Sequence, residues 1–151
     1  MVRRDICCFM VATRFAVAIH ILLLIASDTA DEATSARMAV SIGTNPVVVR
    51  RIAGHLARAR LISVQRGPGG AALARPAAEI TLRDVWRAIH PEKDRLIRVH
   101  GRTSKADPIG RQVPELLRQR FDQAEAAMLR DLAATTIADL LARMEPTRQV
   151  A

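Results

Sequence analysis

Arginine side chains are the most prominent chemical feature of this sequence. Between Glu32 and Glu79 the chain contains no acidic residue. The same window contains seven arginines: Arg37, Arg50, Arg51, Arg58, Arg60, Arg66 and Arg75. Guanidinium groups form paired hydrogen bonds with phosphate, and a continuous positive field attracts a polyanion. The window therefore predicts binding to a phosphate backbone, with DNA as the first partner to test. Arg58, Arg60 and Arg75 are expected to add only a diffuse positive field.

The composition of the whole chain agrees with a polyanionic partner, although less specifically. The formal net charge is +8 and the isoelectric point is near 11.2. A bias toward GC-rich codons can explain part of this charge, because arginine far outnumbers lysine. It does not explain why acids are missing from one window and frequent in the C-terminal third. The 151 residues are 50% apolar but only 3% aromatic, which predicts one folding unit with an aliphatic core.

Two short helices joined at Gly43 are predicted inside the basic window. The first covers 34–41, with a threonine or serine at its start as N-cap. Asn45 is a strong N-cap for the second, 46–59, and Pro46 occupies the first helical position, where a missing N–H costs little. A short helix, a glycine turn and a capped second helix are typical of a helix–turn–helix unit.

The second of these helices carries the side chains expected to contact DNA bases. Asn45, Val47, Val48, Arg50 and Arg51 lie at the end of the helix that enters the major groove in this motif. Arginine can form paired bonds with guanine, asparagine can bond adenine, and a valine methyl can touch the thymine methyl. A simpler alternative is that Asn45 only caps the helix and one arginine only contacts phosphate. We expect capping in either case, and base contact by Val47, Arg50 or a neighbour.

A glycine-rich hairpin tip follows this helix. Residues 61–65 and 71–74 predict two short strands, and Arg66-Gly67-Pro68-Gly69-Gly70 predicts the turn between them. Arg66 is expected to enter a minor groove or to hold phosphate. Gly67 and Gly69 would allow the backbone to approach DNA closely. A hairpin directly after a helix–turn–helix unit is typical of a wing.

The first helix is predicted over 11–27, ahead of the basic window. Its apolar run, 15–26, follows two arginines near the start of the chain and therefore resembles a signal peptide or a membrane anchor. The run is too short to span a bilayer and its residues have helical spacing. A buried core helix is therefore predicted, and a membrane-anchored regulator is the rival interpretation. Residues 1–9 are predicted to be a disordered or over-called extension, with translation from Met10 as an alternative.

The C-terminal part of the chain predicts a linker and one long helix. A helix over 82–89 precedes residues 90–110, where charge, glycine and proline predict a linker. Residues 111–144 have helical spacing over about 45 Å, with Pro114 in the first turn, and 145–151 form a tail. Such a long apolar face predicts a partner helix in a second subunit. The residues expected at that contact are Leu116, Leu117, Phe121, Ala124, Met128, Leu132 and Leu140.

Several short motifs together resemble the Rrf-two family of bacterial winged-helix regulators, the IscR- and NsrR-type proteins. They are the segments 14–20, 43–51, 66–70, 73–76 and 79–82. Each motif is weak alone, but their order and spacing are specific, extend over nearly the whole chain from Met10, and are most similar to a YwnA-like branch. The resemblance implies a winged helix–turn–helix fold and DNA binding. It also implies contacts from Thr44 in the recognition segment, and phosphate contacts from Thr13 and Arg14 at the start of the first helix, where the helix dipole also favours an anion.

The resemblance does not extend to the cofactor. Many relatives bind an iron–sulfur cluster through three cysteines in the linker after the fourth helix. Residues 90–110 contain no cysteine, and the chain's two cysteines, Cys7 and Cys8, lie far upstream. Since thiolates hold such clusters, we expect neither a cluster nor another metal site. The signal stays open as an unknown small-molecule or redox effector, with little support for a Cys7–Cys8 switch.

The predicted fold class is α+β: a mainly helical winged helix–turn–helix domain over 10–89 with a small β-hairpin, plus a long dimerisation helix. No nucleophile elbow, phosphate loop or paired carboxylates indicate an enzyme. The predicted function is a cytoplasmic, homodimeric transcriptional regulator, a repressor that binds a pseudo-palindromic operator. The alternative is a winged-helix adaptor that binds a protein partner and not DNA. Only the DNA binder should lose affinity steeply as salt rises.

Overall fold

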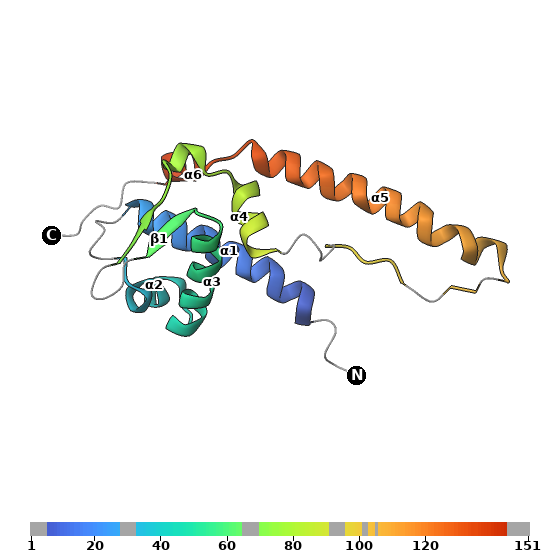
Figure 1. Cartoon of the computed structure of the whole chain (residues 1–151), viewed down its shortest axis with the longest axis horizontal. Helices are drawn as coiled ribbons and strands as arrows, with labels where there is room; N and C mark the ends of the chain where they lie inside the picture. Colours follow the sequence, from blue (N-terminus) through green and yellow to red (C-terminus); the bar gives the residue numbers. More distant parts are fainter. Residues whose placement is uncertain are drawn as a thin grey trace.

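The computed structural model describes residues 6–27, 33–64, 70–90, 96–100, 103–104 and 106–144, with the side chains of the first helix described from Thr13 onward. The helices are α1 (Ile6–Ser27), α2 (Ser35–Ile42), α3 (Pro46–Arg58), α4 (Leu82–Ile89), α5 (Pro108–Ala133) and α6 (Ile137–Arg143), with a short 3-10 helix, η1 (Ala77–Glu79). Two strands, β1 (Ile62–Val64) and β2 (Ala71–Leu73), form an antiparallel hairpin. The predicted class, mainly helical with a small hairpin, is confirmed (Figure 1).

The core forms around α1, which packs against α3, α4, α6 and β2. Ala18, Ile21, Leu22 and Ile25 on one side of α1 are buried. They meet the buried stripe of α3, where Val49, Ile52 and Leu56 follow helical spacing. The buried hydrophobic side chains are aliphatic except for Trp86. The expected aliphatic core is therefore confirmed for the part of the chain that the structure describes.

Trp86 connects α1 to α4 and to the segment after α4. Its ring packs edge-on against Phe15, with centroids 5.2 Å apart at 84°. The buried ring of His90 stacks on the Trp86 ring, with centroids 4.9 Å apart at 12°. Offset and edge-to-face arrangements are the preferred geometries of aromatic pairs. The chain therefore leaves α4 from a packed aromatic group.

Side-chain caps set where α2 and α3 begin. The Thr34 hydroxyl accepts a hydrogen bond from the Arg37 amide at 3.3 Å. Gly43 ends α2 in the left-handed region, with φ 70°, which a side chain would strain. Asn45 Oδ1 accepts from the Val47 amide at 2.8 Å, and Pro46 follows at the first helical position. The predicted capping by Asn45 is therefore confirmed.

The hairpin is held on the core at both of its ends, Ile62 at the base and Ala71 next to the tip. Ile62 pairs with Leu73 and Val64 with Ala71, so each strand is shorter than predicted. Ile62 and Ala71 are buried, and the Ala71 amide donates to the Ala33 carbonyl at 3.2 Å, which joins the hairpin to the start of α2. Between α3 and β1 the chain turns through Arg60, which is left-handed with φ 57°. The tip of the predicted wing lies outside the described residues.

The prediction of one continuous helix over 111–144 is wrong. α5 begins at Pro108 and ends at Ala133, and α6 starts separately at Ile137. Thr136 caps α6 in a reciprocal box with Asp139: the Thr136 hydroxyl accepts from the Asp139 amide at 3.1 Å, and Asp139 Oδ2 accepts from the Thr136 amide at 2.8 Å. Such a box specifies a new helix start. The earlier start also places Pro114 inside α5, not in its first turn.

Tertiary contacts hold α6 on the winged domain. The Leu82 amide donates to the Thr135 carbonyl at 2.9 Å, and the Ile137 amide donates to the Ile80 carbonyl at 2.9 Å. Thr81 and Thr136 form an isolated antiparallel bridge between these two bonds. α6 packs on α1 and η1. Figure 1 shows that α5 projects away from the body of the protein and that its C-terminal end returns to it at α6.

The first helix is longer than predicted. α1 begins at Ile6, so residues 6–9 are helical and the predicted disorder is wrong for them, while translation from Met10 stays a prediction. Residues 6–12 contain no glycine or proline that would end the helix earlier. Residues 1–5 lie outside the described part. None of the helices that the structure describes is long and apolar enough to cross a bilayer.

Candidate nucleic-acid interface

One face of α3 is exposed and carries most of the predicted base-reading residues. The buried stripe of α3 occupies one side of the helix, and Val47, Arg50, Arg51 and Arg58 are exposed on the opposite side. Val47 is 52% exposed although it is apolar. A valine side chain on this face is available to contact a thymine methyl group. The face therefore combines one apolar and three cationic side chains.

The predicted residues near the start of α3 do not all lie on this face. Val48 is half-buried and packs against the core, which leaves Val47 as the exposed valine of the pair. Thr44 is half-buried in the turn before α3. Asn45 is exposed, but its Oδ1 atom is already engaged in the cap. A contact from Asn45 to DNA would therefore use its amide nitrogen.

Arg50 lies where α3 faces the start of α2. Its Nη1 atom donates to the Ser35 hydroxyl at 3.4 Å. Ser35 is the first residue of α2, whose free backbone N–H groups favour an anion. The bond holds the Arg50 guanidinium beside the N-terminus of α2. Two groups that attract phosphate therefore lie together between the helices.

A second basic group forms where α1 packs on α3. Arg58 Nη2 lies 3.0 Å from His55 Nδ1. Since a guanidinium only donates hydrogen bonds, this contact requires His55 to accept at Nδ1 and to carry its proton at Nε2. Burial, followed by the positive charges of Arg58, Arg14 and Arg51, lowers the pKa of His55 below its usual 6.5. We name the residues Arg14, Arg51, His55 and Arg58 the α1–α3 basic cluster.

The structure changes the reason for including Arg14 and Thr13. Both were expected at the start of the first helix, where the helix dipole would help to bind phosphate. Because α1 begins at Ile6, both residues lie beyond its second turn, and the dipole argument is wrong. Arg14 instead gains its position from the packing of α1 on α3, next to His55. His55 is not among the residues predicted to contact DNA, although its spacing to Arg51 and Arg58 on one helix could have indicated the cluster.

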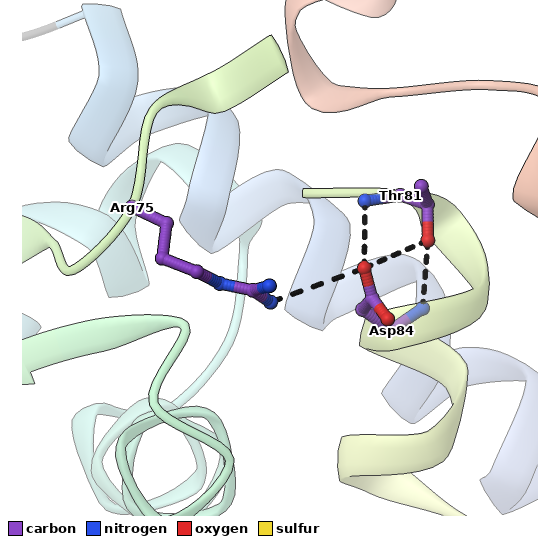
Figure 2. A network of polar contacts seen from close by, with 3 residues as sticks. All are labelled: Arg75, Thr81 and Asp84. Carbon is purple, nitrogen blue, oxygen red and sulfur yellow. Dashed lines mark hydrogen bonds and ion pairs between the residues drawn. The ribbon is translucent and has the colours of Figure 1, made fainter. Parts of the chain in front are cut away.

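The predicted wing residues have two different outcomes. Arg66, Gly67 and Gly69 lie outside the described residues, so their role stays a prediction. Arg75, after β2, points toward α4, where its Nη2 atom is 3.9 Å from Asp84 Oδ2 (Figure 2).

The carboxylate that receives Arg75 also starts α4. Asp84 Oδ2 accepts from the Thr81 amide at 3.1 Å and from the Thr81 hydroxyl at 2.8 Å. The positive charge of Arg75 is therefore partly balanced within the fold. Arg75 does more than add to a diffuse positive field, because it also connects the end of β2 to α4.

The predicted dimerisation stripe is largely present on α5. No residue of α5 is buried, and Leu116 is 61% exposed. Leu117, Phe121, Met128 and Leu132 are half-buried, whereas Ala124 is exposed. Leu140 belongs to α6 and not to this stripe, because the helix breaks before it. The described chain therefore leaves the apolar face of α5 without a full cover.

The outer side of α1 has an apolar hollow of about 350 Å³. Ile19, His20, Leu23 and Leu24 of α1 line it, together with Met144 after α6. His20 Nε2 lies 3.3 Å from the Ser41 hydroxyl of α2. Within the described ranges, no group of three or more His, Cys, Asp or Glu residues is arranged to bind a metal ion.

Comparison with known proteins gives the same assignment throughout. A family model described as "Rrf2: Iron-dependent Transcriptional regulator" matches residues 11–143. The Bacillus subtilis (strain 168) protein YwnA, named as an HTH-type transcriptional regulator, is 36% identical over 132 residues, which cover 87% of this chain and 97% of YwnA.

Solved structures share the fold. A crystal structure described as a DNA-binding protein is 34% identical, with a TM-score of 0.70 over 85% of this chain and 98% of that one. Staphylococcus aureus CymR is 19% identical, with a TM-score of 0.64 over 89% and 99% of the two chains, and shows the likeness of fold alone.

Proposed function

This chain belongs to the Rrf2 family of transcriptional regulators, and from that premise we propose that it is a homodimeric repressor of a pseudo-palindromic DNA operator. Members of this family are DNA-binding regulators and not enzymes. The observation that carries the proposal is the exposed face of α3, where Val47, Arg50, Arg51 and Arg58 stand opposite the buried stripe. The acid-free window around this face leaves no nearby carboxylate in the sequence to repel phosphate.

In this proposal, Val47 and Arg50 contact base edges in the major groove. The α1–α3 basic cluster and the N-terminus of α2 hold the phosphates on either side. Phosphate contacts position the protein, and base contacts select the sequence. Arg66 at the wing tip is proposed to reach the adjacent minor groove.

Two features support a homodimer. The first is the apolar face of α5, which the chain itself does not cover fully. The second is the length of α5, whose 26 residues extend beyond the winged domain. A two-fold pair of α5 helices would present two α3 helices to two half-sites of an operator.

We propose that regulation does not use an iron–sulfur cluster, although the family description includes iron. The support is the sequence of residues 90–110, which contains no cysteine, and the position of Cys7 and Cys8 in α1. Thiolates are the usual ligands of such clusters. The proposed compartment is the cytoplasm, where a repressor meets its operator, and the effector is a small molecule or a redox signal of unknown identity.

Genome-wide footprinting of the purified protein tests the proposal. The wild-type protein should protect discrete sites with two related half-sites, and Arg50→Ala should lose them. Arg130→Ala is the charge-matched control, because Arg130 is exposed on α5, away from α3. Discrete sites that are unchanged in Arg50→Ala would contradict the proposed role of α3.

Salt dependence distinguishes a DNA regulator from a protein-interaction adaptor. Each lost phosphate contact lowers the slope of log affinity against log salt by about 0.9. Arg51→Ala removes one contact per subunit, so the slope of the dimer should fall by about 1.8. Absence of salt-dependent binding to DNA would favour the adaptor.

A further inference from the structure

Gly54 lies at the centre of the exposed face of α3. Arg50 and Arg58 are four residues before and after it, and Arg51 is three residues before it, so all three project beside it. The buried residues Ile52 and Leu56 are on the opposite side of the helix. Gly54 is therefore a position without a side chain, surrounded by side chains that are proposed to contact DNA.

Packing within the protein does not require a glycine here. A Cβ atom at Gly54 would have no neighbouring atom within 4 Å among the described residues, apart from the adjoining backbone of its own helix. The backbone of Gly54 is helical and has no left-handed φ that would call for glycine. Gly43, by contrast, has φ 70° and ends α2.

Glycine in the middle of a helix has a thermodynamic cost. It is the least favourable residue in a helix interior after proline, because the unfolded chain has more backbone freedom to lose. Alanine at position 54 would fit the described fold and would favour α3. Within the described residues the fold gains nothing from the missing side chain, which directs attention to a partner that approaches this face.

We propose that Gly54 is a specificity-determining residue whose missing side chain lets α3 approach the base-pair edges in the major groove of the operator. This inference rests on the proposed function. In this arrangement Arg51 and Arg58 hold phosphates, Arg50 reaches a base edge, and the bare backbone between them sets how deeply the helix enters. A Cβ at this position would separate α3 from the bases and would leave the phosphate contacts in place.

The test compares Gly54→Ala with the wild type on two duplexes. One duplex carries the strongest site that the wild-type protein protects, and the other has the same length and composition with a shuffled sequence. Gly54→Ala should raise the melting temperature by about 2–4 °C, because helix propensity improves. Its affinity for the site should fall about tenfold or more, while its affinity for the shuffled duplex stays unchanged. A larger side chain in Gly54→Val should reduce affinity for the site further.

A matched control separates this effect from a general effect of an added atom. Ala126→Ser adds one heavy atom at an exposed position of α5 and should leave both affinities unchanged. If Gly54→Ala is stabilised and binds the site as tightly as the wild type, the inference is wrong and the regulator proposal stands. If the wild type protects no discrete site, the proposed function fails, and the inference fails with it.

Discussion

Replacing Ile137 by alanine tests whether α6 is truly held on the winged domain. The side chain of Ile137 is fully buried, with 0% exposed, beside the equally buried Ile80. Truncating a buried isoleucine to alanine costs about 2–5 kcal/mol, from lost burial and from the cavity left behind. α6 has only seven residues and rests on the core mainly through Ile137 and Leu141. We therefore expect the loss to release α6 locally and to lower the free energy of unfolding by about 3 kcal/mol.

Urea unfolding, thermal unfolding and hydrogen exchange together measure the loss of stability in Ile137→Ala. For a chain of this size, about 3 kcal/mol corresponds to a fall in melting temperature of roughly 6–12 °C. Exchange of the Ile137 amide, which donates to Ile80, should accelerate more than exchange of the Ile52 amide in α3. Protein concentration must be equal in all samples, because subunit association would shift the apparent stability.

The control is Ile109→Ala at the start of α5, where the isoleucine is 70% exposed. Its effect should stay within about 0.5 kcal/mol. If Ile137→Ala costs no more than this control, α6 is not docked and the interpretation of residues 134–144 is wrong. If one helix instead continued without a break through Thr136, the Thr136 amide would exchange slowly. That slow exchange would not depend on packing against Ile80.

Three further substitutions test local features of the fold. The pKa of His55 in the folded state lies below 6.5, so the unfolded chain binds more protons as pH falls below 6.5, and stability decreases in that range. The urea midpoints at pH 7.5 and pH 5.5 should therefore differ less in His55→Gln than in the wild type. An equal difference in the two proteins would contradict this reasoning. The hydrogen bonds from Thr136 lower the pKa of Asp139 below 3.8. The stabilising contribution of Asp139 is therefore present above pH 3.8 and is lost as pH falls through the pKa of the folded state. Asp139→Asn should reduce the dependence of thermal stability on pH between 5 and 2. Arg60→Gly should stabilise the protein by about 1 kcal/mol in urea unfolding, because a left-handed residue with a side chain is strained, and a loss of stability would show that the arginine side chain compensates.

Local signals in the sequence predicted most of the winged domain. The caps at Thr34 and Asn45, and the glycine turn at Gly43, each depend on residues only a few positions away, and each is confirmed. Such features can be predicted because a single short segment determines them. The fold class followed from their order.

Other features depend on contacts between distant segments. The break before α6 was missed because Leu132 and Leu140, which are eight residues apart, continue a helical spacing across it by coincidence. The threonine and aspartate of the α6 capping box were visible in the sequence, but the bridge from Thr136 to Thr81 was not. The α1–α3 basic cluster is similar, since Arg14 meets His55 only after α1 packs on α3.

The anchored end of α5 has a geometric consequence for the proposed dimer. The Thr81–Thr136 bridge fixes α5 at its C-terminal end, while its N-terminal end lies far from the body of the protein. The 26 residues of α5 span about 39 Å, so a tilt of about 10° at the bridge moves the far end by about 7 Å. That displacement equals roughly two base-pair steps along DNA. In the proposed dimer, the tilt of α5 at the Thr81–Thr136 bridge would therefore help to set the spacing between the two operator half-sites.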